Sequence, residues 1–287
     1  MEDNEKSSMR APNPQQRPGP VRRRTNGLIR LLILHFVAAT GFPVFAQRPD
    51  QLSTRVPMGP GETLVIGFLG GVERWNDEHR SVRRLALRLR ETPGVHAESI
   101  ANRHWRTGEK LVRRALDTNA NGKLDPQEKA QARVILYGQS LGGGAVIRLA
   151  RKLNSWGVPV LLTAQVDSFG LGDGVIPPNV RSAVNYYQNE RLTIRGRREI
   201  RAADGAKTHV IGNFRMRYPM LLPFPQPDEW HRKIFGGAHA RMEADPLLWA
   251  QVELIVRAAQ SGALDLLKLV PLQAATSPAS EEKKETQ

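Results

Sequence analysis

The sequence predicts an α/β protein with a mainly parallel central sheet and helices on both faces. Short apolar segments of strand length alternate along the chain with longer amphipathic segments, and this order is typical of a parallel sheet covered by helices. Some short segments, such as residues 158–166 ("VPVLLTAQV"), are apolar at nearly every position, as expected of strands buried on both faces. With 40% hydrophobic residues among 287, the chain can build one sizeable core.

The expected strands are short runs rich in β-branched and other apolar residues, bounded by glycine, asparagine or aspartate. In chain order they are residues 63–71, 94–102, 134–137, 158–166 and 208–216. The expected helices carry apolar residues three or four positions apart. In chain order they are residues 76–91, 107–116, 127–132, the segment after Gly142, and 246–259. A further helix is expected at residues 177–188, because prolines open this segment and proline is favoured in the first turn of a helix.

The N-terminal segment predicts export of the protein. A basic leader precedes the uncharged apolar stretch "LLILHFVAATGFPVFA", with small residues at Val44 and Ala46 before Gln47. This pattern is typical of a secretory signal peptide, and an uncleaved membrane anchor is the alternative. We expect a periplasmic or extracellular location. The expected regions are the signal segment with its basic leader (1–46), a linker (47–61), the core domain (62–262) and a polar C-terminal tail (263–287).

The segment 133–150, "RVILYGQSLGGGAVIRLA", contains the strongest candidate for a catalytic residue. An expected strand leads into Gly138-Gln139-Ser140-Leu141-Gly142, and helical spacing follows. Strand, G-x-S-x-G and helix in this order predict a nucleophile elbow, in which a tight turn exposes the serine hydroxyl. The Leu141 N–H, at the start of the helix, would face a developing oxyanion.

With these motifs the chain resembles the α/β-hydrolase superfamily, on the lipase, esterase and thioesterase side. The resemblance covers residues 62–260 and rests on "YGQSLGG", the earlier "IGFLGG", and the later "VDSFG" and "GGAHARM". It implies a catalytic triad in the chain order serine, acid, histidine, with no catalytic cofactor. It also implies that the loop after the first expected strand supplies a second oxyanion N–H, which maps onto Phe68, Leu69 or Gly70, centred on Leu69.

The serine needs a base with a pKa near 7, and the base needs a carboxylate that holds its tautomer. His239 lies after the last expected strand and before the last expected helix, which is where the resemblance places the base. His231 is its rival, and His209, inside an expected strand, is expected to be structural. For the acid, Asp167 ends the strand that follows the elbow helix, and Asp204, just before the next strand, is the alternative.

Residues 117–128, "DTNANGKLDPQE", match the EF-hand calcium loop, D-x-[DN]-x-[DN]-G-x₅-E. Such loops bind calcium through side-chain and backbone oxygens at fixed positions, and a glycine at the sixth position permits the sharp turn. The candidate ligands are Asp117, Asn119, Asn121, the Lys123 carbonyl, Asp125 and Glu128. The sequence therefore predicts a structural Ca²⁺ site before the elbow strand, with modest affinity because only three carboxylates contribute.

Charge and composition narrow the function further. The formal net charge is +14, but the arginines are spread over amphipathic helices and no nucleic-acid-binding motif is present, so no specific nucleic-acid partner is expected. A basic surface permits peripheral contact with an anionic membrane. The chain has no cysteine, which excludes a thiolate nucleophile and disulfides. We expect a serine hydrolase that cleaves a small-molecule or lipid carboxylic ester or thioester. The alternative is a catalytically silent binding protein of the same fold.

Overall fold

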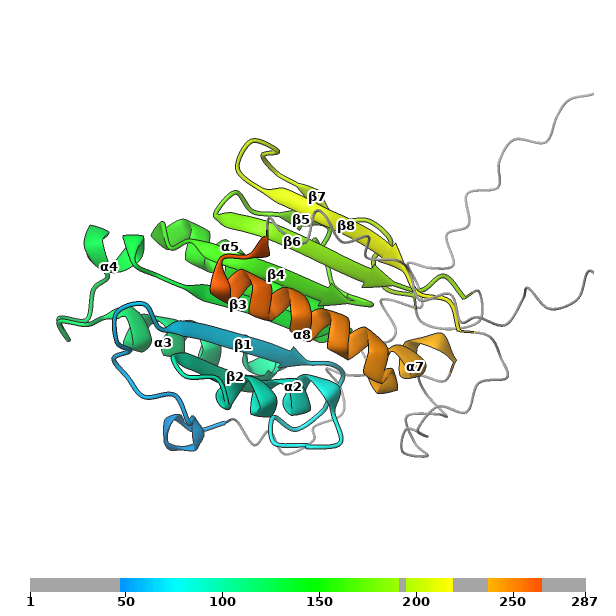
Figure 1. Cartoon of the computed structure of the whole chain (residues 1–287), viewed down its shortest axis with the longest axis horizontal. Helices are drawn as coiled ribbons and strands as arrows, with labels where there is room; N and C mark the ends of the chain where they lie inside the picture. The colour runs from blue at the N-terminus through cyan, green and yellow to red at the C-terminus, as the bar shows by residue number, and fades with distance from the viewer. Residues whose placement is uncertain (1–46, 191–194, 219–236, 265–287) are drawn as a thin grey trace, which may run out of the picture. The chain divides into compact units, whose positions relative to one another are not determined.

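A parallel six-stranded sheet forms the centre of the computed structural model, which describes residues 47–190, 195–218 and 237–264. Every pairing in this sheet is parallel (Figure 1). The strand order across it is β2 (Val95–Ala101), β1 (Thr63–Leu69), β3 (Val134–Gln139), β4 (Val160–Val166), β6 (Val180–Tyr187) and β8 (His209–Arg215). A separate two-stranded pair consists of β5 (Val175–Ile176) and β7 (Arg201–Ala202). The predicted α/β class with a mainly parallel sheet is confirmed.

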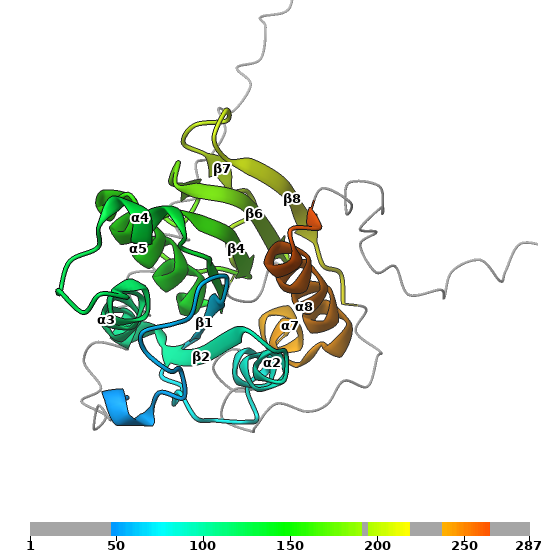
Figure 2. The same cartoon turned by 60° about the vertical axis from the view of Figure 1, so that its left-hand side comes forward.

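Helices cover both faces of the sheet (Figure 2). On one face α3 (Trp105–Leu116) and α5 (Leu141–Trp156) pack against the strands, and on the other face α2 (Ser81–Arg90), α7 (Ala238–Ala244) and α8 (Pro246–Ser261) do so. Strand β1 shows how both faces are filled. Its residues Leu64, Ile66 and Phe68 belong to the apolar core on the side of α3 and α5, whereas Val65 and Leu69 belong to the core on the side of α2 and α8. Successive side chains of a strand point to opposite faces, so a nearly continuous apolar run serves both layers.

Short helices complete the architecture. Helix α4 (Pro126–Ala130) lies between α3 and β3, and single 3₁₀ turns occur at Pro49–Gln51 and Asn102–His104. In the described part of the chain, no helix has the length and apolarity needed to cross a membrane. The predicted signal segment, residues 1–46, and most of the predicted C-terminal tail lie outside the described residues.

Two expectations about the elements were wrong. Residues 177–188 were expected to be a helix, but most of this segment forms strand β6. Its prolines lie in a turn, in which the Val180 N–H donates a hydrogen bond to the Pro177 carbonyl. The residues that follow are largely buried, and half of them are β-branched or aromatic, which favours a strand. No helix was expected between the last strand and residues 246–259, but Ala238–Ala244, which includes His239, is the short helix α7.

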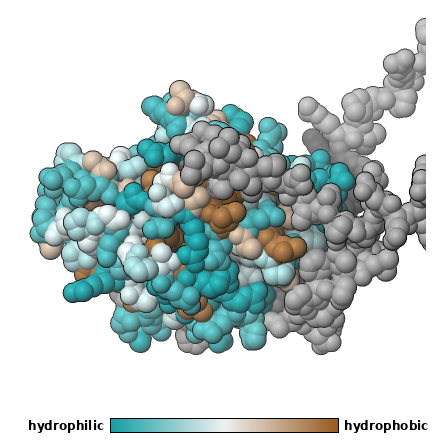
Figure 3. Space-filling model, in the orientation of Figure 1, coloured by the Kyte–Doolittle hydropathy of each residue, from teal (hydrophilic) through white to brown (hydrophobic). Residues whose placement is uncertain are grey.

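The surface is mainly polar. On the face that Figure 3 shows, hydrophilic residues cover most of the described area and hydrophobic residues form small separate areas. Among the described residues, the exposed large hydrophobic side chains are those of Leu171, Leu247 and Leu254. Isolated apolar side chains of this kind are ordinary on a folded protein and indicate no docking surface by themselves.

Candidate active site

Ser140 occupies a strained turn between β3 and α5, as the G-x-S-x-G motif predicts. Its φ and ψ are 55° and −124°, a combination that residues other than glycine rarely adopt. A side chain at Gly138 would lie 2.6 Å from the Gly142 carbonyl carbon, and one at Gly142 would collide with the Phe68 carbonyl. Both glycines are therefore required by close backbone contact. The Ser140 N–H bonds to the Val166 carbonyl at 2.9 Å, which fixes the turn against the end of β4.

His239 and Asp167 form a buried pair beside this turn. The His239 Nδ1 lies 2.6 Å from the Asp167 Oδ2, and the two residues are 4% and 0% exposed. Asp167 directly follows β4 and has a φ of 43°, a positive value that is uncommon outside glycine. Strained backbone of this kind persists where the surrounding structure over-determines it, and it is common at functional sites.

Further donors hold the Asp167 carboxylate in place. Its Oδ1 accepts hydrogen bonds from the Gly196 N–H at 2.9 Å and from the Gln188 N–H at 3.4 Å. Its Oδ2 accepts a bond from the Gln188 side-chain amide at 3.0 Å in addition to His239. Gln188 follows the last residue of β6, and the sequence reasoning missed its role because that segment was expected to be helical. Assignment of residues 180–187 to a strand would have placed Gln188 at the same sheet edge as Asp167.

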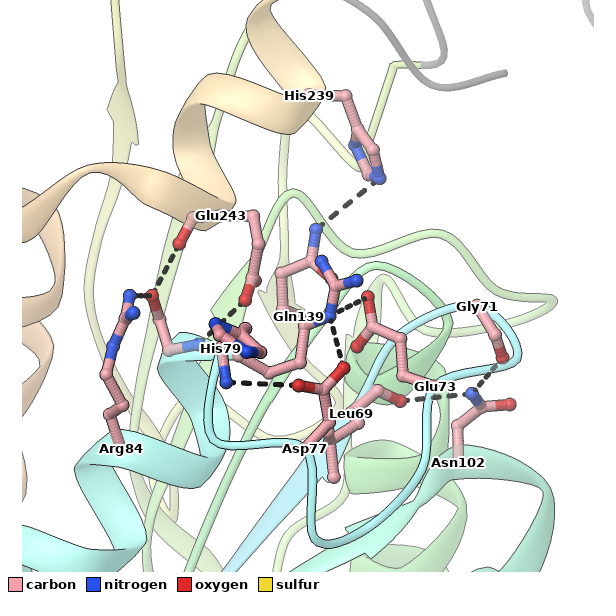
Figure 4. Close-up of polar contacts among 12 residues, drawn as sticks. Leu69, Gly71, Glu73, Asp77, His79, Arg84, Asn102, Gln139, His239 and Glu243 are labelled. Atoms are coloured by element: carbon pink, nitrogen blue, oxygen red, sulfur yellow. Dashed lines mark hydrogen bonds and ion pairs between the residues drawn. The ribbon is translucent and has the colours of Figure 1, made fainter. Parts of the chain in front are cut away.

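The second nitrogen of His239 faces the elbow. Its Nε2 lies 3.4 Å from the side-chain nitrogen of Gln139, the residue before Ser140 (Figure 4). Because the Asp167 carboxylate accepts the proton of Nδ1, Nε2 is the nitrogen that is left unprotonated in the neutral ring. A neutral imidazole in this orientation can accept a proton from a nucleophile on the elbow side.

The expected oxyanion donors lie around the same turn. Leu141 is the first residue of α5, so its N–H has no acceptor within the helix. Leu69 is the last residue of β1, and its carbonyl accepts a bond from the Asn102 side-chain amide at 3.0 Å. That amide also bonds to the Gly71 carbonyl at 2.7 Å and thereby fixes the loop after β1 (Figure 4). A side chain at Gly70 would lie 3.0 Å from the Ser140 Cβ, so this loop passes close to the serine.

The alternative residues lie elsewhere or outside the described residues. Asp204 follows β7, where its carboxylate accepts the Ala206 N–H at 3.0 Å and pairs with Lys207 at 3.7 Å. His209 is an exposed residue at the start of β8. His231 lies outside the described residues. Of the candidates for base and acid, the structure brings His239 and Asp167 together.

The EF-hand-like loop closes on itself through hydrogen bonds from its backbone N–H groups to its own side-chain oxygens. The two Asp117 carboxylate oxygens accept the N–H groups of Asn121 at 3.0 Å and Gly122 at 2.8 Å. Gly122, at the sixth position, has a φ of 77°, which glycine adopts readily. The Asn119 side-chain oxygen accepts the Asn121 N–H, and that of Asn121 accepts the Lys123 N–H.

The end of the loop joins α4 through a capping box. The Asp125 side chain accepts the Glu128 N–H, and the Glu128 carboxylate accepts the Asp125 N–H. Hydrogen bonds from the Asp125 N–H and then the Thr118 hydroxyl lower the pKa of Glu128, so its carboxylate stays charged, as a calcium ligand must. Within the described ranges no three His, Asp or Glu side chains gather as a metal site. Three of the six expected ligands are amide or backbone oxygens, which do not belong to such a cluster of His, Asp and Glu side chains. The calcium site therefore stays a prediction.

Comparison of the chain with family models and with curated proteins identifies no relative: no family model matches the chain, and no curated protein does.

Proposed function

We propose that the protein is a serine hydrolase of the α/β-hydrolase type that cleaves a carboxylic ester or thioester. The main support is the strained backbone of Ser140 between a buried parallel strand and a helix, beside the hydrogen-bonded His239–Asp167 pair. In open parallel sheets, ligands bind outside the carboxyl ends of the strands, and these residues all lie at that edge.

Each residue would have a distinct chemical role. The Ser140 Oγ would bond to the acyl carbon while the His239 Nε2 takes its proton, and the same proton would then pass to the departing alkoxide or thiolate. Asp167 would hold the imidazole and stabilise its charged form. The Leu141 N–H and a donor around Leu69 would stabilise the oxyanion. Water would then attack the acyl-serine, again with His239 as base, and release the carboxylic acid. These roles require no cofactor.

A fluorophosphonate probe tests the proposal, because it labels an activated serine whatever the natural substrate is. We expect labelling of the purified wild type and none of Ser140→Ala, with hydrolysis of a panel of nitrophenyl esters and acyl-thioesters by the wild type alone. Folded wild-type protein that neither reacts with the probe nor cleaves the panel would favour the alternative, a silent binding protein of the same fold.

Three further proposals accompany this function. The loop 117–128 would bind Ca²⁺ as a structural ion through the six ligands named above. The signal segment 1–46 would direct the chain to the periplasm or the extracellular space, cleaved or retained as an anchor. The substrate would be a small molecule or a lipid, and the basic surface would support peripheral contact with anionic membrane.

A further inference from the structure

The acid of the candidate triad depends on a hydrogen-bond donor that lies outside the central sheet. The Asp167 Oδ1 accepts the Gly196 N–H at 2.9 Å, and this is the shorter of its two bonds from backbone N–H groups. Residues 195–200 form neither helix nor strand, so no strand pairing holds Gly196 in place. A side chain at Gly196 would collide with the Asp167 backbone, so the two segments are in close contact. Another interaction must therefore fix Gly196 against the acid.

Arg197, the residue after Gly196, binds the loop that follows β4 through both its backbone and its side chain. Its N–H donates to the Ser168 carbonyl at 2.7 Å. Its guanidinium donates to the Asp173 Oδ1 from Nε at 2.8 Å and from Nη2 at 2.6 Å. The same Nη2 also donates to the Gly170 carbonyl at 3.2 Å. The position of Arg197, and with it that of Gly196, is therefore set by this loop.

Asp173 connects the two sides of the acid. It is 1% exposed, and while its Oδ1 accepts the two bonds from Arg197, its Oδ2 accepts the Ser168 hydroxyl at 2.5 Å. Ser168 directly follows Asp167, and Arg197 directly follows Gly196. One buried carboxylate thus links the neighbour of the acid to the neighbour of the acid's donor.

The loop after β4 is itself fixed against the nucleophile elbow. The Phe169 N–H donates to the Ser140 carbonyl at 2.9 Å. A side chain at Gly143, in the first turn of α5, would collide with the side chain of Ser168. This close packing leaves the loop little freedom to shift. The ion pair of Asp173 therefore extends the fixed geometry of the elbow to the segment 195–200.

We propose that Asp173 and Arg197 are a positioning pair for the acid of the candidate triad. The pair holds the Gly196 N–H on the Asp167 carboxylate, and so keeps this carboxylate in the orientation that the His239 ring requires. A charged pair joined by two parallel N–H bonds constrains geometry more strictly than one neutral hydrogen bond does. Both residues act through the acid, so neither is a catalytic residue. The effect on catalysis rests on the proposed function, whereas the effect on Gly196 does not.

Arg197→Lys tests the pair without changing the charge. Lysine keeps the positive charge, but its ammonium is a point charge and cannot reproduce the planar fork that binds Asp173 through two nitrogens. The matched control is Arg90→Lys, in the pair that joins α2 to β2. The Arg90 guanidinium also binds a buried carboxylate, that of Glu98 at 2.9 Å, and a backbone carbonyl, that of Ala97 at 2.6 Å. The two arginine side chains are similarly exposed, at 31% for Arg197 and 25% for Arg90.

The activity test separates kcat from KM. With a nitrophenyl ester, Arg197→Lys should lower kcat by about tenfold or more and change KM by less than about twofold, because a displaced acid weakens the transition state and not substrate binding. Asp173→Asn should have the same effect, and the double variant should be no worse than either single variant, since the two residues act as a unit. Arg90→Lys should keep both constants within about twofold of the wild type. Equal kcat values for Arg197→Lys and Arg90→Lys, measured where both proteins are folded, would overturn the inference.

Hydrogen exchange followed by NMR measures the Gly196 N–H directly. The experiment uses the Ser140→Ala background, where catalysis plays no part. The Gly196 amide should exchange slowly there and at least about tenfold faster once Arg197→Lys is added, while the amides of β3 keep their protection. Adding Arg90→Lys instead should leave the exchange of Gly196 as it was. A Gly196 amide that exchanges equally fast with either lysine substitution would contradict the inference.

The two tests distinguish failure of this inference from failure of the proposed function. If the wild type shows no hydrolysis but the exchange of Gly196 rises as expected, the proposed function fails and the positioning of Gly196 stands. If the wild type cleaves esters and Arg197→Lys keeps its kcat, the inference fails and the proposed function stands. If Arg197→Lys does not fold, Asp173→Asn takes its place in both tests. If neither folds although Arg90→Lys does, the pair is a general requirement of the fold and the inference is overturned.

Discussion

At the scale of single residues, Ser140 and Asp167 both have a positive φ, at 55° and 43°, although neither is glycine. Such backbone costs about 1–3 kcal/mol per residue and persists because neighbouring contacts hold it. The Ser140 N–H is bound to the end of β4, and Asp167 is held by Gly196, Gln188 and His239. Strain at both positions is therefore supported by the ends of three adjacent parallel strands.

Substitution of Ser140 separates chemistry from stability. Ser140→Ala should reduce ester hydrolysis by at least about a thousandfold and change the free energy of unfolding by less than about 0.5 kcal/mol, because the hydroxyl is expected to act in the reaction and not in packing. Ser140→Gly should be equally inactive but more stable than Ser140→Ala by about 1 kcal/mol, since glycine adopts this φ without strain. Steady-state kinetics and urea unfolding measure both effects. Retention of more than about a thousandth of the activity by either variant would remove Ser140 as the nucleophile.

His239 should be as important as Ser140 for hydrolysis. His239→Ala should lose as much activity as Ser140→Ala, and the double variant should be no worse than either single variant, because groups that act as a unit are non-additive. His231→Ala serves as the control and should retain activity. Loss of hydrolysis in His231→Ala, with activity kept in His239→Ala, would move the base to His231.

At the scale of elements, the calcium prediction concerns the segment from α3 to α4. With a Kd in the range of about 10⁻⁴ to 10⁻³ M, calcium at about tenfold excess over Kd should stabilise the fold by about 1.4 kcal/mol. Calorimetric titration and thermal melts should detect this in the wild type and not in Glu128→Gln. Glu128 also closes the capping box of α4, so each protein is compared with and without calcium, and not with the other. No heat at millimolar calcium, or equal binding by both proteins, would exclude the site.

The elements also show what sequence patterns can and cannot predict. The strand and helix around Ser140 follow from a buried apolar run and helical spacing, and they lie where expected. Residues 177–188 were assigned wrongly because opening prolines suit a helix start and a turn equally well, and it is the pairing with β4 and β8 that makes most of the segment a strand. The Asp167–His239 contact joins residues 72 positions apart, so the sequence could suggest the pair but not decide against Asp204. The sequence carries no local signal for the bonds from Gln188 to Asp167, since these bonds arise from packing between segments that are far apart in the chain.

At the scale of the whole molecule, the prediction of export can be checked at the N-terminus. If the signal segment is cleaved where the small residues predict, N-terminal sequencing of the exported protein should begin at Gln47. Ala46→Arg should block cleavage, because a bulky charged residue does not suit that position, and the uncleaved chain should accumulate with the membrane fraction. An exported wild type that retains the apolar stretch would identify the segment as an anchor.

The parallel sheet also determines when the site comes into existence. Each sheet pairing joins strands separated by a crossover, and α7 is synthesised only after all the strands of the described sheet. Long-range pairings of this kind form slowly, because large loops must close before any contact compensates for the lost entropy. A chain that ends before residue 238 should therefore fail to react with a fluorophosphonate even if its sheet assembles, and reaction of such a fragment would contradict this. If the protein is the hydrolase proposed above, the nascent chain would leave the acyl esters of its own cell intact until α7 has been synthesised.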